Sequence, residues 1–360
     1  MAEIRVGIIG ASANNGWAKA SHVPAIRATP GMKLTAVGTS KAASAKAAAE
    51  AFGADHWFDD PKALVTSPDV DLVAVCVRVP SHRNLVIAAL EAGKHVMCEW
   101  PLGRNVAEAK ELASLAEQAG VHTSVGLQGR MNPAVTAAAE QLRSEQFGKP
   151  LTARIVSTTI GYAPEMGDAW AYLNDKSNGA NLSTITGGHT FDLAIQLLGP
   201  IADIGALTTI QFPKVTLTDS GTVIDRNVPD HILASARYAN GCVLSVELGG
   251  HRSPTPFSFE IVGTKGIVTL TGGNSSGFQA GDLFLTTSWG GEVSTPHSDP
   301  ETVHAFNMTY LYQALAEDIH SGAHRVPDFG YAARLTSLLD DMLNAAAQDN
   351  RIANGDWPKP

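Results

Sequence analysis

The sequence predicts two kinds of sheet in succession, an α/β domain followed by an α+β domain. In the first third of the 360 residues, continuous apolar runs alternate with alanine-rich helical segments. From residue 151 onward, strand candidates instead alternate apolar and polar residues between turns. Continuous runs are typical of parallel strands buried on both faces, and alternation is typical of antiparallel sheets with one open face. We therefore expect a doubly wound parallel sheet over residues 1–128 and a large open, mainly antiparallel sheet with helices over residues 129–360.

The first domain is predicted to alternate strands with helices. The apolar runs are expected to be strands, over residues 4–10, 33–40, 70–77, 94–100 and 122–128. The segments between them have helical patterns, near residues 16–28, 42–52, 81–92 and 105–119. This order implies right-handed crossovers between parallel strands.

The second domain is predicted to be a sheet that helices interrupt and follow. Alternating patterns indicate strands within residues 151–162, 202–212, 230–239, 242–251, 257–272 and 282–289. Helical spacing of apolar residues indicates helices near residues 184–198, 302–320 and 328–348.

Composition narrows the class of protein. The chain is 44% hydrophobic and 17% charged, and it holds no apolar run long enough to cross a bilayer. The net charge of −9 offers no basic surface for nucleic acid. Three scattered cysteines predict neither a disulfide framework nor a zinc site, and no histidine spacing indicates a metal. Because the apolar start is needed as a strand, we expect no signal peptide and a cytoplasmic protein without membrane contact.

A glycine-rich turn, RVGIIGASANNGWA, follows the first strand. Nucleotide loops need glycine because a pyrophosphate must approach backbone N–H groups at a helix N-terminus. Gly10 fits the tight turn and Gly16 the start of the helix, while Ser12, Asn14 and Asn15 can donate hydrogen bonds to phosphate. The alternative is a strand–turn–helix that binds nothing.

The end of the second strand bears on which nucleotide binds. Thr39, Ser40 and Lys41 stand there, and no carboxylate follows until Glu50. Hydroxyls and a lysine suit a 2′-phosphate, which favours NADP over NAD, although NAD stays possible. The alternative is a helix cap at Ser40 followed by a solvated lysine.

With these segments placed, the chain resembles the Gfo/Idh/MocA family of sugar-type oxidoreductases. The resemblance rests on VGIIG, VDLVAVCVRVPSH, ALEAGKHVMCEWPL, LQGRMNP, GHTFDLAIQLLG and GTKG. It implies an N-terminal Rossmann domain and a C-terminal α+β domain, whose open sheet often forms the interface of a homodimer or homotetramer. It also implies further cofactor contacts, at Trp17, Val79, Pro80, His82, Glu99, Trp100 and Gln128. A turn and a helix cap are the alternative for Pro80 and His82.

The sequence departs from the family at two positions. The family usually carries Glu-Lys-Pro, with a proton-transferring lysine, where this chain has Glu99, Trp100 and Pro101. It also places an aspartate four residues before its active-site histidine, where this chain has Ile185 before His189. Trp100 cannot transfer a proton, since its indole N–H only donates. It can instead form an apolar wall beside the nicotinamide or a sugar, or simply fill the volume of the lysine.

The remaining side chains suggest a site around His189. His189 is the best acid/base that remains, and the alternative is a histidine satisfied by neighbouring backbone. Tyr162 and Arg130 are candidates to polarise a substrate oxygen. Asp192, one turn further, is expected either to orient the imidazole or to cap its own helix. Trp170 lies in a segment that can line a sugar pocket or serve as a core or lid residue.

Several features also resemble a subgroup of this family that contains the fungal galactose-pathway repressor. These are the GWAKASHVPAI segment, LQGR, GHTFD and VPDH, together with the two departures. The resemblance to the whole family favours an NAD(P)-dependent oxidoreductase acting on a sugar or a related polyol or carbonyl compound, because most proteins of this architecture are enzymes. The alternatives are a non-catalytic NADP- or sugar-sensing regulator that acts through a protein partner, and a redox-neutral enzyme that keeps its nicotinamide.

Overall fold

The computed structural model describes residues 2–251, 257–293, 295–355 and 357. The chain forms two compact units, which are described separately below. Unit 1 comprises Met1–Gln128 and Asp299–Ala333, and unit 2 comprises Gly129–Ser298 and Arg334–Pro360. The first unit thus contains a segment that lies beyond residue 128, within the range that the sequence assigned to the second domain.

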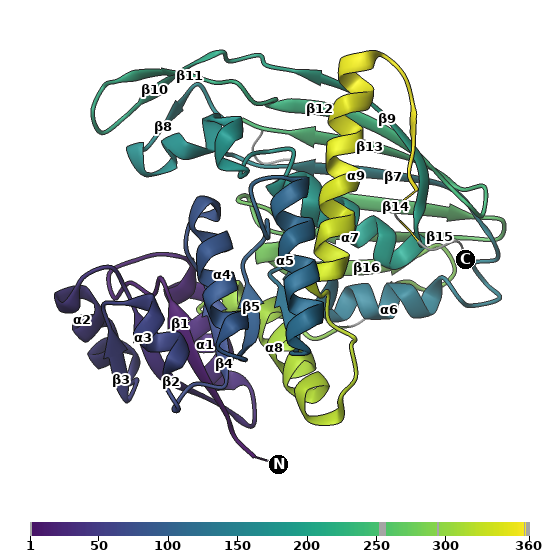
Figure 1. Ribbon diagram of the computed structural model, residues 1–360. Coiled ribbons are helices and arrows are strands. Elements are labelled where there is room, and N and C mark those ends of the chain that lie inside the picture. Colours follow the sequence, from purple (N-terminus) through teal and green to yellow (C-terminus); the bar gives the residue numbers. More distant parts are fainter. Residues whose placement is uncertain (1, 252–256, 294, 356, 358–360) are drawn as a thin grey trace. The chain divides into compact units, whose positions relative to one another are not determined.

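Unit 1 is built on a parallel sheet of six strands in its described part, in the order β3-β2-β1-β4-β5-β6 (Figure 1). Strand β4 is buried along its whole length, and β5 is buried except at His95, as their continuous apolar runs predicted. The strands are β1 (Ile4–Ile9), β2 (Met32–Gly38), β3 (His56–Phe58), β4 (Leu72–Val75), β5 (His95–Cys98) and β6 (Thr123–Val125). The helices between them are α1 (Val23–Ala28), α2 (Ala42–Phe52), α3 (Pro61–Thr66), α4 (His82–Glu91) and α5 (Val106–Ala119).

Two features of unit 1 were not predicted. Strand β3 and helix α3 were missed because β3 is a short edge strand, HWF, without a buried residue. The first helix also begins as a π-helix over Ala18–His22 (η1), and only then continues as α1.

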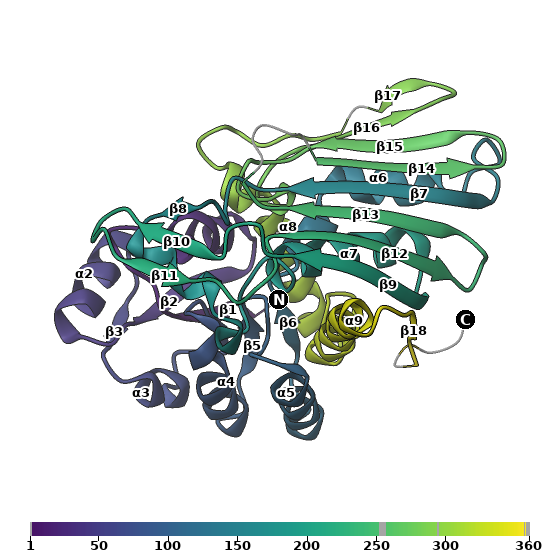
Figure 2. The same ribbon diagram turned by 90° about the horizontal axis from the view of Figure 1, so that it is seen from above.

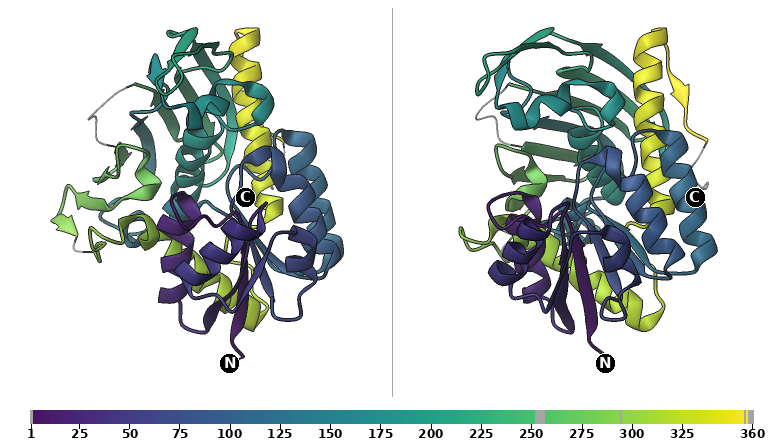
Figure 3. Two further views of the ribbon diagram at one scale, coloured as in Figure 1. Left: turned by 90° about the vertical axis from the view of Figure 1, so that its left-hand side faces the viewer. Right: turned by 60° about the vertical axis from the view of Figure 1, so that its left-hand side comes forward.

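Helix α8 (Val303–Ser321) completes unit 1 from late in the chain. It packs against η1 and α1 (Figure 3), where Leu311, Tyr312 and Leu315 are fully buried. The segment after α8 reaches the edge of the sheet, because the Val125 N–H donates to the Pro327 carbonyl at 2.9 Å. No helix in the described ranges has an apolar stretch that could cross a membrane.

Unit 2 is built on a mixed sheet of nine strands in its described part, in the order β17-β16-β15-β14-β7-β13-β12-β9-β18 (Figure 2). Neighbouring strands are antiparallel except for β7 and β13. The predicted fold class is thereby confirmed. The strands are β7 (Pro150–Thr158), β9 (Ile201–Thr209), β12 (His231–Tyr238), β13 (Val243–Gly249), β14 (Phe257–Gly263), β15 (Ile267–Gly272), β16 (Leu283–Thr287), β17 (Gly291–Val293) and β18 (Ile352–Ala353).

Helices cover one face of this sheet. In β12 every second residue is buried, as in Ile232, Ala234 and Ala236, while Leu233 between them is 55% exposed. Helix α6 (Pro133–Gln141) contacts β15 and β16, and α7 (Ile185–Leu198) contacts β7. The unit also contains α9 (Phe329–Gln348), which begins in unit 1.

A second, three-stranded sheet of unit 2 was not predicted. It has the order β11-β10-β8 and consists of β8 (Glu165–Met166), β10 (Lys214–Leu217) and β11 (Val223–Asp225). A fully buried ion pair follows β11 in the chain, with Arg226 Nη1 at 3.1 Å from Asp230 Oδ2. Burial by itself raises the pKa of Asp230, but the N–H groups of Gln211 and Phe212 and the Arg226 guanidinium lower it below its usual range.

We expect Asp230→Ala to destabilise unit 2 by about 3–5 kcal/mol, because it leaves the Arg226 charge buried without its counter-ion. Asp225→Ala is a matched control, since its ion pair with Lys214 is 78% and 67% exposed and is expected to contribute less than about 1 kcal/mol. Urea unfolding curves of both variants and the parent measure the difference. Equal losses for the two substitutions would contradict the importance of the buried pair.

Candidate functional site

The nucleotide-site residues predicted for unit 1 lie on the loops that follow its parallel strands. Because the carboxyl ends of parallel strands meet at one edge, the structure brings these loops together there. The residues after β1, β2, β4 and β5 include Gly10, Thr39, Val79 and Glu99. The sequence therefore located this edge correctly, while the roles of single side chains remain predictions.

Gly10 is required by the path of the chain. Its φ is +98°, and a Cβ there would lie 2.5 Å from the Cys76 carbonyl oxygen at the end of β4. Its N–H donates to the Gly38 carbonyl at 2.8 Å, which ties the turn to β2. No side chain fits between these strand ends, so the loop begins as a bare backbone turn.

The rest of the glycine-rich loop is open. Gly16 has a φ of +112°, and nothing lies within 4 Å of the position where its Cβ would be. Asn14 and Asn15 are exposed, and Ser12 Oγ accepts a hydrogen bond from the Asn14 N–H at 3.3 Å. Lys19 Nζ donates to the Ala13 carbonyl at 2.7 Å, which adds a cation to the loop.

The loop after β2 exposes the predicted lysine. Lys41, and not Ser40, is the N-cap residue of α2, and it makes no side-chain cap, so the capping role considered for Ser40 is wrong. The Thr39 hydroxyl bonds within the loop, to Ser44 Oγ and the Lys41 carbonyl. The Lys41 side chain therefore remains exposed at the start of α2.

The loop after β4 contributes backbone more than side chains. Val79 is buried and Pro80 is exposed, in a 3-10 turn over Val79–Ser81 (η2). His82 is completely buried, with Nε2 at 2.9 Å from the Val77 carbonyl and Nδ1 at 2.9 Å from the Pro101 carbonyl. Its side chain therefore holds two loops of this edge together, which does not fit the direct cofactor contact that we predicted for it.

The segment after β5 carries Glu99 and Trp100. Trp100 is 6% exposed and is joined to Pro101 by a cis peptide bond. The Glu99 side chain is 18% exposed, and its Oε1 lies 2.9 Å from His22 Nε2.

His22 is a residue of this site that the sequence reasoning missed. It is fully buried, and its Nδ1 lies 2.8 Å from the Tyr312 hydroxyl, so it links η1 to α8 and to Glu99. Burial by itself lowers the pKa of His22, whereas the neighbouring Cys76 and Glu99 side chains raise it, and the balance is above its usual range. No sequence signal indicated this contact, because the partners lie 77 and 290 positions away.

The unit 1 edge fits a dinucleotide. Two of its buried polar atoms, Trp17 Nε1 and Gln128 Oε1, have no hydrogen-bond partner within the described residues. Buried polar atoms in native proteins are nearly always satisfied by protein, water or a ligand. A bound ligand is one way to satisfy these two atoms, and the turn at Gly10 opens a loop of the kind that phosphates approach.

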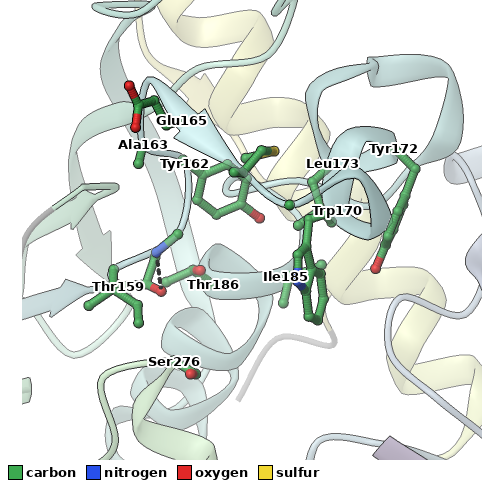
Figure 4. Close-up of a pocket in the computed structure, with 14 residues that line it drawn as sticks. Thr159, Tyr162, Ala163, Glu165, Trp170, Tyr172, Leu173, Ile185, Thr186 and Ser276 are labelled. Atoms are coloured by element: carbon green, nitrogen blue, oxygen red, sulfur yellow. Dashed lines mark hydrogen bonds between the residues drawn. The ribbon is translucent and has the colours of Figure 1, made fainter. Parts of the chain in front are cut away.

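Unit 2 contains a cavity of about 420 Å³ beside β8 and the start of α7 (Figure 4). Three aromatic side chains line it: Tyr162, Trp170 and Tyr172. Its aliphatic lining includes Ile160, Met166, Leu173 and Ile185. The polar side chains in its wall, apart from the aromatic ones, are Thr159, Glu165, Thr186 and Ser276. The predicted residues Tyr162 and Trp170 therefore share one cavity, and Trp170 lies in a 3-10 segment over Asp168–Asn174 (η4).

Tyr162 is held in an unusual backbone conformation. Its φ is +57°, which is rare for a bulky residue and persists only where surrounding contacts enforce it. The enforcing contacts come from Arg226, which donates to the carbonyls of Tyr162 and Ala163 at 2.8 Å each. Burial raises the pKa of the Tyr162 hydroxyl, so it stays a neutral donor.

His189 lies on α7, one turn after the cavity-lining residues Ile185 and Thr186. Burial lowers the pKa of its imidazole to about 3. Its buried Nδ1 has no hydrogen-bond partner in the part of the chain that the structure describes. Phe278 packs edge-on against the ring, with 6.5 Å between centroids. His189 is therefore a neutral imidazole at neutral pH, a weaker base than a free histidine, with one ring nitrogen that has no partner among the described residues.

Asp192 does not cap α7, because it lies inside the helix, whose N-cap residue is Thr184. Its Oδ1 instead lies 3.1 Å from Arg130 Nη2, and the two side chains are 2% and 9% exposed. This pair ties α7 to the chain before α6, so Arg130 is engaged with a buried carboxylate. Within the described ranges, no group of three histidine, cysteine or acidic side chains could hold a metal ion.

Residues of both units match models of known protein families. Residues 4–127 match the model described as the oxidoreductase family with an NAD-binding Rossmann fold, Gfo/Idh/MocA. Residues 133–272 match the model of the Gal80p C-terminal domain.

Individual proteins extend the similarity over most of the chain. Dehydrogenase aclE of Aspergillus oryzae is 34% identical over 81% of this chain and 82% of its own length. The galactose/lactose metabolism regulatory protein GAL80 of Saccharomyces cerevisiae is 25% identical over 92% of this chain and 83% of its own length. The solved structure of levoglucosan dehydrogenase in complex with NADH and L-sorbose has the same fold, with a TM-score of 0.84 and 21% identity over 100% of both chains. This chain belongs to the Gfo/Idh/MocA oxidoreductase family, within its Gal80-like subgroup.

Proposed function

We propose that this protein is an NADP-dependent oxidoreductase that acts on a sugar or a related polyol or carbonyl compound, with His189 as its acid/base. The observation that carries the proposal is the neutral, buried imidazole of His189, with an unpartnered Nδ1 one turn from a cavity wall. Family membership and similarity to a dehydrogenase support it.

The nucleotide is proposed to bind at the carboxyl edge of the parallel sheet. The turn from Gly10 to Gly16 leaves backbone free for a pyrophosphate, and Lys41 offers an exposed cation for a 2′-phosphate. Trp17 Nε1 and Gln128 Oε1 offer a buried donor and a buried acceptor. When bound, the nicotinamide supplies the hydride chemistry of the reaction.

The chain itself supplies the proton transfer. In the oxidation of an alcohol, the His189 imidazole accepts the hydroxyl proton, and in the reduction of a carbonyl it returns that proton to the oxygen. The Tyr162 hydroxyl is a neutral donor that can hold the same oxygen. These roles replace the lysine that the family usually carries where this chain has Trp100.

A second candidate is a non-catalytic regulator that binds NADP or a sugar and acts through a protein partner. It is favoured by Trp100 and Ile185, which replace both usual partners of the histidine, and by similarity to GAL80 over 92% of the chain. Calorimetry with NADP, followed by absorbance at the reduced-nicotinamide wavelength across a panel of sugars and polyols, separates the two functions. Turnover supports the enzyme, and tight binding without turnover supports the regulator.

We expect Lys41→Glu to weaken NADP binding at least tenfold, about 1.4 kcal/mol, and to change NAD binding less than threefold. The reason is that only NADP presents a phosphate to this position. Calorimetric titration with both nucleotides measures the ratio. Lys46→Glu, on the exposed face of the same helix, makes the same charge change and should leave that ratio closer to the parent value. An unchanged ratio for Lys41→Glu would exclude Lys41 from the nucleotide site.

We expect His189→Ala to lower kcat/KM about 100-fold or more, the range found for loss of a general acid/base. Because the pKa of His189 is about 3, its imidazole is neutral from about pH 5 to pH 8. The rate of alcohol oxidation should therefore not fall with an apparent pKa near that of free histidine. Initial rates across this pH range check both points, with His297→Ala as a control at an exposed histidine of unit 2. A variant as active as the parent would exclude His189 from proton transfer.

A further inference from the structure

We infer that the cavity of unit 2 narrows the proposed substrate class to its least hydroxylated members, an alcohol or ketone whose body is mostly hydrocarbon or aromatic, and disfavours a sugar with a hydroxyl on every carbon. The identity of the reacting group rests on the proposed oxidoreductase function. The kind of ligand that binds is inferred from the cavity alone, because it depends only on the side chains that form the cavity wall.

Most of the surface that the wall presents to the cavity is apolar, although polar side chains also line it. Thr159 Oγ1 already accepts a hydrogen bond from the Gly161 N–H at 3.2 Å, which Figure 4 draws as a dashed line. The carboxylate of Glu165 is directed away from Trp170 and Ile185 (Figure 4). A hydroxyl that enters such a cavity without a partner loses its hydrogen bonds to water and gains none in return, which weakens binding.

The centre of the wall is apolar. The side chains of Tyr162, Trp170 and Ile185 converge on one region of the cavity (Figure 4). Ile185 is the residue that stands four positions before His189, and it presents a hydrocarbon surface there. Trp170 is 57% exposed, so a ligand that covers its ring removes a large apolar area from water.

Two of these three residues carry a polar group, the indole N–H of Trp170 and the hydroxyl of Tyr162. The Tyr162 hydroxyl keeps its proton, because burial raises its pKa, and its backbone is fixed by the buried Arg226. It can therefore donate one hydrogen bond to the oxygen of a ligand. A volume of about 420 Å³ lies within the range of small-molecule sites, and it admits a body of one or two rings. One oxygen on an apolar ring system matches this arrangement.

Calorimetric titration without nucleotide tests the inference, using 2-tetralol, cyclohexanol and myo-inositol as probes. Cyclohexanol and myo-inositol share a six-membered carbon ring and differ in carrying one or six hydroxyls. We expect 2-tetralol to bind at least tenfold more tightly than myo-inositol, with cyclohexanol between them. Tighter binding of myo-inositol, or no binding of 2-tetralol at its solubility limit, would overturn the inference. Because no nucleotide is present, this result does not depend on turnover.

Two variants locate the binding in this cavity. Trp170→Ala should weaken 2-tetralol binding at least fivefold, whereas Trp57→Ala, at a 43% exposed tryptophan of unit 1, should leave it unchanged. Ile185→Asp should weaken 2-tetralol binding at least tenfold and strengthen myo-inositol binding, a reversal that loss of structure cannot produce. Binding that is unaffected by both cavity variants would overturn the assignment. Absence of turnover with a cavity that still binds 2-tetralol would instead count against the proposed function alone.

Discussion

The guanidinium of Arg226 is the constraint on which the cavity of unit 2 depends. It is fully buried, pairs with Asp230, and donates to Asn174 and to the carbonyls of Tyr162 and Ala163. These contacts come from separate segments of the chain, and a guanidinium offers its donors in a rigid planar fork that can reach them together. The left-handed backbone of Tyr162 follows from this anchoring. A small cavity with a defined shape thus rests on one buried cation and its acceptors.

The two units differ in how far the polar side chains at their sites are exposed to solvent. At the carboxyl edge of unit 1, polar side chains are exposed to solvent, as in Asn14, Asn15 and Lys41. In unit 2 the polar group His189 is buried instead, and its imidazole stays neutral. The wall of the neighbouring cavity presents a mainly apolar surface. One unit is therefore suited to an anionic ligand that brings its own charge. Unit 2 is suited to a ligand with no charge and few polar groups.

Sequence patterns located most of the long regular elements and the edge at which the loops after the parallel strands meet. Continuous apolar runs such as 70–77 contain β4, and helical spacing located α7 and α9 almost to the residue. The patterns failed for a short, exposed strand and for side-chain contacts between residues far apart in the sequence. β3 is too short and too exposed to have a signal. The pairing of Asp192 with Arg130 and the link from His22 to Glu99 are long-range contacts that no local spacing encodes.

The return of residues 299–333 to unit 1 bears on how the protein is synthesised. When the first 128 residues leave the ribosome, the surface of α1 and η1 that α8 covers is still open to water. At 5–20 residues per second, that surface waits on the order of ten seconds for its helix. Nascent chains would thus present an apolar groove to chaperones for most of translation, and a fragment that stops at residue 128 would keep that groove permanently.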